Sequence, residues 1–422
     1  MLNVFKFGGA SVKDAQGVKN LAEIVRSNTG DLIVVISAMG KTTNALEQLL
    51  AHYIADNPKV WDDFSTIRDY HLTIAASLCQ DACPDRVKEI EDLFINLEQR
   101  LKVRPQGNYN FNYDQIVSYG ELISTKIVSI YLNAVGVKNT WVDVRRVLRT
   151  DSNYREGNVD FKESQKLCKQ NFNFTDEKIF VTQGFIGGTA DGYTTTLGRE
   201  GSDYTAALLA NLLDAHSVTI WKDVDGVLNA DPRIFSDTIK LDRVSFREAI
   251  ELAYCGAQII HPKTIKPLQN KQISLFVKSF TNISSNGTRV YQTEEHIDYP
   301  PIRIVKSNQV LVSLTPRDFS FVIEDCLSKI FAVLYNHRVK ANLVQSSAIS
   351  FSICVDNEDH FLPSAIEELN RSFEVKYNKG LELLTVRHFT QELIDKMLKG
   401  RSVFLQQKTR STIRVVYQSS EP

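Results

Sequence analysis

The sequence contains no long apolar run and no excess of charge of either sign. Its longest apolar stretches are about as long as one strand, far short of the roughly 20 residues that a membrane-spanning helix needs. The 49 Lys and Arg residues are balanced by 50 Asp and Glu residues, which leaves a net charge of -1. This balance does not indicate a protein built around nucleic-acid phosphates or an anionic membrane surface. We therefore expect neither nucleic acid nor a membrane as a partner.

Cysteine is scarce, and a secretion signal is lacking. The six cysteines include no Cys-x-x-Cys pair, and in a chain of 422 residues we interpret them as reduced thiols. The opening residues, MLNVFKFGG, have no basic segment followed by an apolar run, which a signal peptide would require. We predict a cytoplasmic protein.

What remains is the composition of an ordinary globular protein. Hydrophobic residues make up 43% of the chain and charged residues 23%, both of which are typical values. A chain of 422 residues is too long for one core. At about 150 residues per domain, this length predicts two or three domains.

The first part of the chain alternates between strand-like and helix-like segments. NVFKF is a short apolar strand, residues 14–28 have apolar residues at helical spacing, and DLIVVISA is a continuous apolar run typical of a strand buried on both faces. Strand, helix and strand at this spacing form a βαβ unit, which predicts a parallel sheet. KIFVTQGFIG and HSVTIWKDVDG are two more buried-type strands, separated by the apolar helix SDYTAALLANLLDA.

The character of the chain changes near residue 290. Residues 282–301 are polar and rich in turn-forming residues, and they end in two prolines, so we place a boundary there. Beyond it, a βαββαβ order of elements is followed by a shortened second start, which is a weak internal repeat. We predict one domain at residues 1–297 and two small α+β modules at residues 303–380 and 381–422, of which the second is shortened.

Two glycine-containing stretches follow predicted strands. In KFGGAS, Gly8 and Gly9 allow backbone N–H groups to face anionic oxygens, with Lys6 as a nearby cation; a plain turn beside a surface lysine is the alternative. SAMGKTTN contains Gly-Lys-Thr, but lacks the upstream glycine of a P-loop, and we reject that motif. Ser37 and Thr43 either contact a polar ligand at the carboxyl end of a sheet or cap the next helix.

Charged residues gather in three further stretches. TLGREGSD is read as a helix N-terminus, which favours anions, preceded by Arg199, which can hold a carboxylate through two hydrogen bonds. Its Asp203 either orients a lysine or only caps the helix. In SYGELIS, Glu121 is either a helix-surface carboxylate or a partner for a substrate ammonium group. WKDVDGVLNADPRI suits the edge of a nucleotide site or any acidic turn.

The joint order of the motifs is more informative than any one of them. VFKFGGASV, VVISAMGKTTN, SYGELIS, TQGFIG, TLGREGSDYTAALLA, KDVDGVLNADPR and AYCGAQIIHPKTIKPL together resemble the aspartate kinases of the amino-acid kinase superfamily. The resemblance covers residues 1–280, and the tail resembles the ACT regulatory modules of these enzymes. It implies an α/β fold, in which a three-layer αβα kinase domain with a mostly parallel central sheet is followed by a ferredoxin-like (βαββαβ) ACT region.

The resemblance also implies a reaction. It is the ATP-dependent, Mg²⁺-assisted phosphorylation of the side-chain carboxylate of L-aspartate to 4-phospho-L-aspartate, which opens lysine, threonine, methionine and diaminopimelate biosynthesis. A carboxylate with a pKa of about 3.9 is already ionised at pH 7, so catalysis needs alignment and charge neutralisation rather than a general base. The alternatives are a related kinase for glutamate or N-acetylglutamate, and a catalytically weak ACT-type amino-acid sensor.

Roles for individual residues follow from motif position within the family. Lys6, Gly8 and Gly9 are implied to contact the phosphates and the transition state, with Asp203 holding Lys6 in place. The implied aspartate site consists of Ser37, Thr43, Glu121, Arg199 and Ser202, with Arg199 on the α-carboxylate and Glu121 on the ammonium group. The implied nucleotide site consists of Lys6, Gly8, Gly9, Lys222, Asp223, Gly226, Arg233 and Gln258. Mg²⁺ is expected on phosphate oxygens, and no protein ligand is assigned to it.

The chain departs from the family pattern at several of these positions. Glu200 replaces the first glycine of the usual GGSD, and a carboxylate facing the phosphates would repel them by about 1 kcal/mol or more. We therefore predict that Glu200 points to solvent. Gln258 replaces a lysine, which removes one expected phosphate contact, and Lys222 or Lys263 could compensate.

The first ACT module departs from the pattern of lysine-sensitive relatives. Ala348 stands where a glutamate would pair with the amino group of an effector, and Asn342 stands where an aspartate is usual. An unpaired ammonium group costs a few kcal/mol, so lysine inhibition is not favoured, while an amino-acid effector remains possible. We expect the ACT region to mediate a homodimer or a higher oligomer, because open sheet edges need covering.

Overall fold

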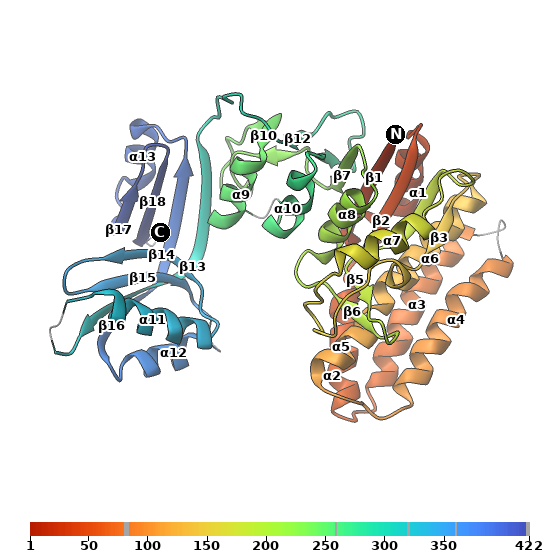
Figure 1. The fold of residues 1–422 in the computed structure, drawn as a ribbon, viewed down its shortest axis with the longest axis horizontal. Coiled ribbons are helices and arrows are strands. Elements are labelled where there is room, and N and C mark those ends of the chain that lie inside the picture. The colour runs from red at the N-terminus through yellow and green to blue at the C-terminus, as the bar shows by residue number, and fades with distance from the viewer. Residues whose placement is uncertain (80–83, 258–259, 319–320, 359–360, 419–422) are drawn as a thin grey trace. The chain divides into compact units, whose positions relative to one another are not determined.

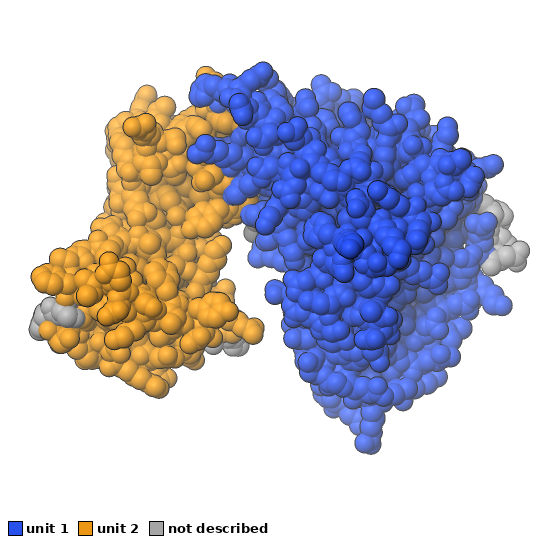
Figure 2. All heavy atoms as spheres, in the orientation of Figure 1, with its two compact units in different colours: residues 1–227, 240–250, 259–297 blue, residues 228–239, 251–258, 298–422 orange. Residues whose placement is uncertain are grey.

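The computed structural model describes residues 1–79, 84–257, 260–318, 321–358 and 361–418. The chain forms two compact units (Figure 2). Unit 1 consists of residues 1–227, 240–250 and 259–297, and unit 2 consists of residues 228–239, 251–258 and 298–422. Unit 2 therefore includes two short segments that precede residue 297. In the part of the chain that the structure describes, no helix is both long and apolar enough to cross a bilayer.

Unit 1 is built on an eight-stranded sheet (Figure 1). Its strands lie in the order β10 (Arg243–Ser245), β12 (Thr288–Tyr291), β11 (Ser274–Ser279), β7 (Ser217–Lys222), β1 (Leu2–Phe7), β2 (Asp31–Ile36), β4 (Ile179–Gln183) and β3 (Thr140–Val142). Every neighbouring pair is parallel except β11 and β12. The predicted α/β class and mostly parallel central sheet are confirmed.

Helices cover this sheet because its central strands are apolar on both faces. Residues 32–36 of β2 are fully buried, as expected of an inner parallel strand. Leu32, Val34 and Ile36 pack in one cluster with the helices that lie between β1 and β3 in the chain. These helices are α1 (Ala15–Arg26), α2 (Thr42–Ile54), α3 (Val60–Cys79), α4 (Pro84–Leu101), α5 (Tyr109–Val117) and α6 (Tyr119–Ala134).

The other elements of this part of the chain include the helix that forms one wall of the candidate site. That helix is α8 (Gly201–Leu212), which packs against β1, β2 and β7 and against α10 (Pro262–Asn270). The remaining elements are η1 (Gly9–Val12), η2 (Val144–Arg146), α7 (Phe161–Asn171), β5 (Ile186–Gly188), β6 (Thr194–Thr196), β8 (Val227–Leu228), β9 (Lys240–Leu241) and α9 (Phe246–Cys255).

Unit 2 contains one six-stranded antiparallel sheet. Its order is β14 (Ala341–Ser346), β15 (Phe351–Asp356), β13 (Ile302–Pro316), β16 (Phe373–Arg387), β18 (Thr412–Gln418) and β17 (Ser402–Lys408). The helices are α11 (Glu324–Asn336), α12 (Leu362–Leu369) and α13 (Gln391–Leu398). The order β13–α11–β14–β15–α12–β16 is the predicted βαββαβ, and β16–α13–β17–β18 is the shortened second start.

The two long strands run through both halves of this sheet. β13 and β16 have 15 residues each, and their pairing shifts register on either side of Gln309. One half packs on α11 and α12, and the other half packs on α13. FEVKY and LELLTVRHF, which the sequence separates, are therefore parts of the single strand β16, and the sheet has no break between the modules.

The two early segments of unit 2 are held on these long strands. Arg303 on β13 donates its N–H to Asn229 O at 2.8 Å and pairs with Asp237 at 2.9 Å. Arg387 on β16 pairs with Glu251 at 3.1 Å. Segments that belong to the kinase part of the sequence are thus fastened to the antiparallel sheet.

Candidate active site

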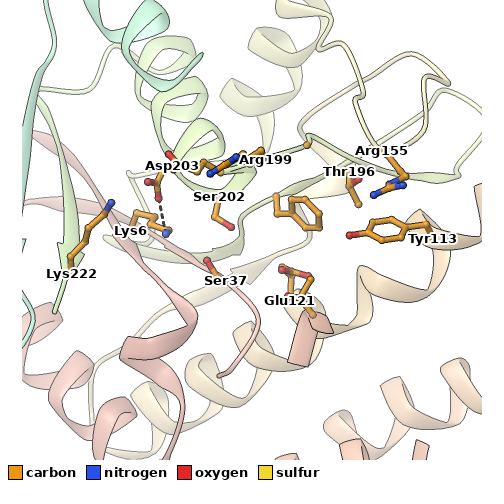
Figure 3. A pocket seen from close by; sticks show the side chains of 15 residues that line it. Lys6, Ser37, Tyr113, Glu121, Arg155, Thr196, Arg199, Ser202, Asp203 and Lys222 are labelled. Atoms are coloured by element: carbon orange, nitrogen blue, oxygen red, sulfur yellow. Dashed lines mark ion pairs between the residues drawn. The ribbon is translucent and has the colours of Figure 1, made fainter. Parts of the chain in front are cut away.

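A cavity of about 570 Å³ lies in unit 1, where β1 and β2 end and α8 begins (Figure 3). Its lining comes from segments that are far apart in the sequence. The lining residues are Lys6, Ser37, Thr43, Tyr113, Glu121, Arg155, Phe185, Thr196, Gly198, Arg199, Glu200, Gly201, Ser202, Asp203 and Lys222. The fold thus brings together all five residues predicted for the aspartate site and, from the catalytic set, Lys6 and Asp203.

The centre of the cavity is an ion pair between β1 and α8. Lys6 Nζ lies 2.6 Å from Asp203 Oδ1, and the two side chains are only 11% and 5% exposed. Asp203 stands in the first turn of α8, where the helix dipole stabilises a carboxylate. Asp203 therefore fixes the position of the lysine ammonium group, as the dashed line in Figure 3 marks.

The two glycines after β1 do not line the cavity. A Cβ at Gly9 would lie 2.5 Å from Ala38 O, which is impossibly close. Gly9 is therefore required so that η1 can pack against the backbone that follows β2. At Gly8, a Cβ would lie 3.6 Å from Lys6 Nζ, which places this backbone beside the ion pair.

Glu121 is a buried carboxyl group that opens onto the cavity. It stands in the first turn of α6 and is 2% exposed. Its Oε1 accepts the Ala38 N–H at 3.3 Å, whereas Oε2 has no hydrogen-bond partner among the described residues. Burial raises the pKa of Glu121 to about 8. The alternative of a helix-surface carboxylate is therefore wrong, and the free oxygen suits a cationic group of a ligand.

The loop before α8 presents a second polar surface. Gly198 has φ of +78°, which favours glycine, and the exposed Arg199 that follows makes no contact through its charge with any other described residue. Lys263 Nζ donates to Leu197 O at 3.0 Å, which fastens the start of this loop to α10. Ser202 is buried beside Asp203. Arg199 is thus a cation on the cavity wall, available to an anionic ligand.

The position of the Glu200 side chain differs from the one that the sequence predicted. It lines the cavity, its Oε2 is buried, and this oxygen has no hydrogen-bond partner in the described part of the chain. The prediction that Glu200 points to solvent is therefore wrong. The physical reason is its position as the N-cap of α8 with φ of +53°, in the left-handed region, within the loop that forms the cavity wall.

Besides Glu200, sequence reasoning gave no site role to six residues of the lining: Tyr113, Arg155, Phe185, Thr196, Gly198 and Gly201. The Arg155 guanidinium lies 4.4 Å from the centre of the Tyr113 ring, and Figure 3 shows this pair on the side of the cavity away from Lys6 and Lys222.

Buried Asp114 accepts the N–H groups of Arg155 and Thr196, each at 2.9 Å, and so ties two of these segments together. The charged Asp114 in the otherwise uncharged NYDQIV was the one signal of this wall in the sequence.

Only some of the residues predicted for the nucleotide site line the cavity. Lys222 lines the cavity, but Asp223 and Gly226 do not. Gly226 has φ of +140°, and a Cβ there would lie 2.5 Å from Thr288 Oγ1, so packing alone requires glycine. Arg233 belongs to unit 2, is 80% exposed and pairs with Asp231 at 2.6 Å. Gln258 lies outside the described residues.

Comparison with known proteins agrees with this geometry. The model of the amino acid kinase family matches residues 1–279. Lysine-sensitive aspartokinase 3 of Escherichia coli is 32% identical over 91% of this chain and 86% of its own length. A chloroplastic bifunctional aspartokinase/homoserine dehydrogenase 2 of Arabidopsis thaliana is 33% identical over 70% of this chain, and the chain spans 33% of that longer protein.

Solved structures show the same similarity. E. coli aspartokinase III in complex with aspartate and ADP superposes with a TM-score of 0.83 at 29% identity, over 99% of this chain and 96% of that one. Aspartate kinase from Clostridium acetobutylicum has the same fold, with a TM-score of 0.80 at 22% identity over 99% and 96% of the two chains. The chain belongs to the amino acid kinase family and, within it, to the aspartokinases.

Proposed function

We propose that the chain transfers the γ-phosphoryl group of ATP to the side-chain carboxylate of L-aspartate and so forms 4-phospho-L-aspartate. One observation carries the proposal: a single cavity holds the Lys6–Asp203 ion pair and an oxygen of Glu121 that has no hydrogen-bond partner within the described part of the chain. The first suits a phosphoryl group and the second suits an amino group. The E. coli relative, which was solved with aspartate and ADP, supports the same pair of ligands.

In this proposal, L-aspartate is held at both of its backbone charges. Arg199 binds the α-carboxylate, for which a guanidinium offers two parallel hydrogen bonds. Glu121 accepts the ammonium group and becomes ionised when it does so. Ser37, Thr43 and Ser202 contribute hydroxyl groups from the same lining. These contacts leave the side-chain carboxylate of the substrate free to face Lys6.

Phosphoryl transfer then depends on positioning and on charge. Lys6 neutralises charge on the transferred group, and Asp203 keeps Lys6 in place. Gly8 and Gly9, which do not line the cavity, are retained as proposed backbone contacts to the phosphates, because Gly8 lies beside Lys6. Lys222 adds a second cation of the lining. Asp223, Gly226, Arg233 and Gln258 are retained as the proposed edge of the nucleotide site. No general base is required, because the attacking carboxylate is ionised.

Mg²⁺ is proposed as the metal cofactor, and when bound it supplies positive charge that offsets the phosphate oxygens. Among the described residues, no three His, Cys, Asp or Glu side chains are close enough to form a metal site by themselves. The donors of the cavity nevertheless fit a hard cation, because carboxylate oxygens such as Glu200 Oε2 accept no hydrogen bond from any residue that the structure describes.

Regulation and assembly are also proposals. The E. coli relative is named as lysine-sensitive, and a second structure of it contains lysine and aspartate. In this chain Asn342 is 6% exposed and accepts a hydrogen bond from Lys306 Nζ at 3.0 Å. We propose that an amino-acid effector is possible, that inhibition by lysine is not favoured, and that the ACT region mediates a homodimer or a higher oligomer. Steady-state assays with lysine, threonine and methionine, added singly, test the first point.

A trapping experiment tests the reaction itself. The protein is incubated with ATP, Mg²⁺ and one acceptor at a time, and hydroxylamine converts any acylphosphate to a hydroxamate. L-Aspartate should give hydroxamate, whereas glutamate and N-acetylglutamate should not. Hydroxamate from glutamate alone would favour the related kinase, and no hydroxamate from any acceptor would favour the amino-acid sensor.

A further inference from the structure

The loop before α8 carries one charged group to which the proposed aspartate and phosphate contacts give no role. Glu200 adopts φ of +53°, a left-handed conformation that is unfavourable for a non-glycine residue. Its buried Oε2 has no hydrogen-bond partner among the described residues, which is a second unfavourable feature. None of the described residues offsets these two features through a hydrogen bond to this oxygen.

The charges around Glu200 indicate which kind of ligand could offset its left-handed backbone and its unpaired oxygen. Its neighbours in the cavity include Lys6 and Asp203, which already neutralise each other at 2.6 Å. A phosphate at the N-terminus of α8 would meet the Glu200 carboxylate as a like charge, and the two groups would repel each other. A divalent cation between the two anions reverses the sign of this interaction.

The chemistry of the donor selects the cation. Mg²⁺ binds oxygen ligands, keeps several waters, and typically takes only one or two carboxylates in addition to substrate phosphates. Of the other two carboxylates of the lining, Asp203 is committed to Lys6, and Glu121 is assigned to the substrate ammonium group. Glu200 is the carboxylate left for a metal.

We propose that Glu200 is a protein ligand of the Mg²⁺ ion that accompanies the nucleotide, either directly or through one water. The inference rests on the proposed function, because it requires phosphates in this cavity. Its consequence is a linkage between metal and nucleotide: Glu200 opposes the binding of metal-free nucleotide and favours the binding of the magnesium complex. The chain should therefore depend on Mg²⁺ for nucleotide affinity more strongly than a variant without this carboxylate.

Calorimetric titration with ADP, in EDTA and in excess Mg²⁺, measures this linkage as the ratio of the two dissociation constants. Glu200→Gln keeps the shape of the side chain and removes its charge. We expect the ratio to fall at least tenfold in this variant, with metal-free ADP binding more tightly and the magnesium complex more weakly. Glu156→Gln is the matched control, because Glu156 is exposed, packs near Gly198 and does not line the cavity; its ratio should stay within twofold of the parent.

Two further measurements keep a folding effect apart from a metal effect. The electron paramagnetic resonance signal of Mn²⁺ with ADP should report weaker metal binding in Glu200→Gln than in the parent or in Glu156→Gln. Glu200→Gly should unfold at a higher temperature than the parent, because glycine relieves the left-handed backbone, yet it should show the same reduced ratio as Glu200→Gln.

A ratio within twofold of the parent in both Glu200 variants would overturn the proposal, as would an equal loss of affinity with and without metal. In these cases the parent would still form hydroxamate from aspartate. A parent that binds no ADP under either condition and forms no hydroxamate would overturn the proposed function as well.

Discussion

The two units each contain a cluster of partly buried polar side chains, and the clusters differ in one respect. In unit 1, buried oxygens of Glu121 and Glu200 have no partner among the described residues. In unit 2, the Asp356 carboxylate accepts Gln309 Nε2 at 2.7 Å and pairs with Lys306 Nζ at 2.9 Å. The same kinds of group are thus left open in one unit and are satisfied internally in the other.

The pKa values of Glu121 in unit 1 and Asp356 in unit 2 are shifted in opposite directions, as this difference in hydrogen bonding predicts. Burial raises the pKa of Glu121 to about 8, because its hydrogen bonds are too few to offset the loss of water. Burial would also raise the pKa of Asp356, but hydrogen bonds from Gln309 and Lys306 outweigh it and hold the pKa below its usual value. A fully hydrogen-bonded polar network stabilises a fold, whereas buried polar atoms without partners are typical of a ligand-binding site.

The largest expected effect comes from removing one lysine from each cluster. Lys6→Ala should lower the rate of hydroxamate formation from aspartate by about 10²- to 10³-fold or more, because it removes preorganised positive charge from the transferred group. Lys306→Ala makes the same deletion in unit 2 and should change the rate by less than about threefold. A Lys6→Ala enzyme that works within a few-fold of the parent would mean that the ion pair is only structural.

Glu121→Gln should stabilise the ligand-free protein, and more so at high pH. The folded pKa of about 8 exceeds the ordinary value of 4.5, so the stability that this group contributes is fully present below 4.5 and is lost as the pH rises through about 8. One pKa unit corresponds to 1.36 kcal/mol, and the total loss is on the order of a few kcal/mol. Urea unfolding at pH 5 and pH 8 should show a larger gain for Glu121→Gln at pH 8; equal gains would contradict the pKa.

Asp356→Ala should destabilise the protein, which is the opposite of the effect expected for Glu121→Gln. It leaves Lys306, Gln309 and Asn342 without their shared acceptor, which should cost about 2–3 kcal/mol of unfolding free energy. Because Asp356 is ionised above its lowered pKa, this loss should shrink as the pH falls below about 4. Urea unfolding measures both effects, and a variant as stable as the parent at pH 7 would mean that the network contributes nothing.

The smallest expected effect is the release of protons when L-aspartate binds. At pH 7 the ligand-free Glu121 is mostly protonated, and the ammonium group of L-aspartate should convert it to the ionised form. Binding of L-aspartate should then release up to about one proton. Titration calorimetry in two buffers of different ionisation enthalpy measures the release, which should vanish in Glu121→Gln. A binding heat that does not depend on the buffer in the parent would contradict this prediction.

Much of unit 1 could be predicted from the sequence because its signals are local. The apolar run DLIVVISA becomes the fully buried strand β2, and Lys6 is placed near the end of β1 by its position before two glycines. The meeting of Lys6 with Asp203 was predicted only through the family resemblance, because nothing local links residues 197 positions apart.

Other features depend on contacts that no local pattern reveals. KSNQ in the middle of β13 looks like a loop, yet Asn308 takes φ of +54° within a register shift and the strand continues. NKG in β16 is similar, since Gly380 has φ of +70°. At Glu200, charge repulsion suggested solvent, whereas the path of the loop places its oxygen in the cavity wall. The Tyr113–Arg155 wall depends on Asp114, whose partners lie about 40 and 80 residues away.

The fastening of residues 228–239 and 251–258 to the antiparallel sheet bears on how this protein can be dissected. A fragment that stops at residue 297 would lose Arg303 and Arg387, and with them the ion pairs of Asp237 and Glu251. Two stretches of the fragment would then have no scaffold to fold upon. The contributions of the two units are therefore better separated by point substitutions than by cutting the chain at residue 297.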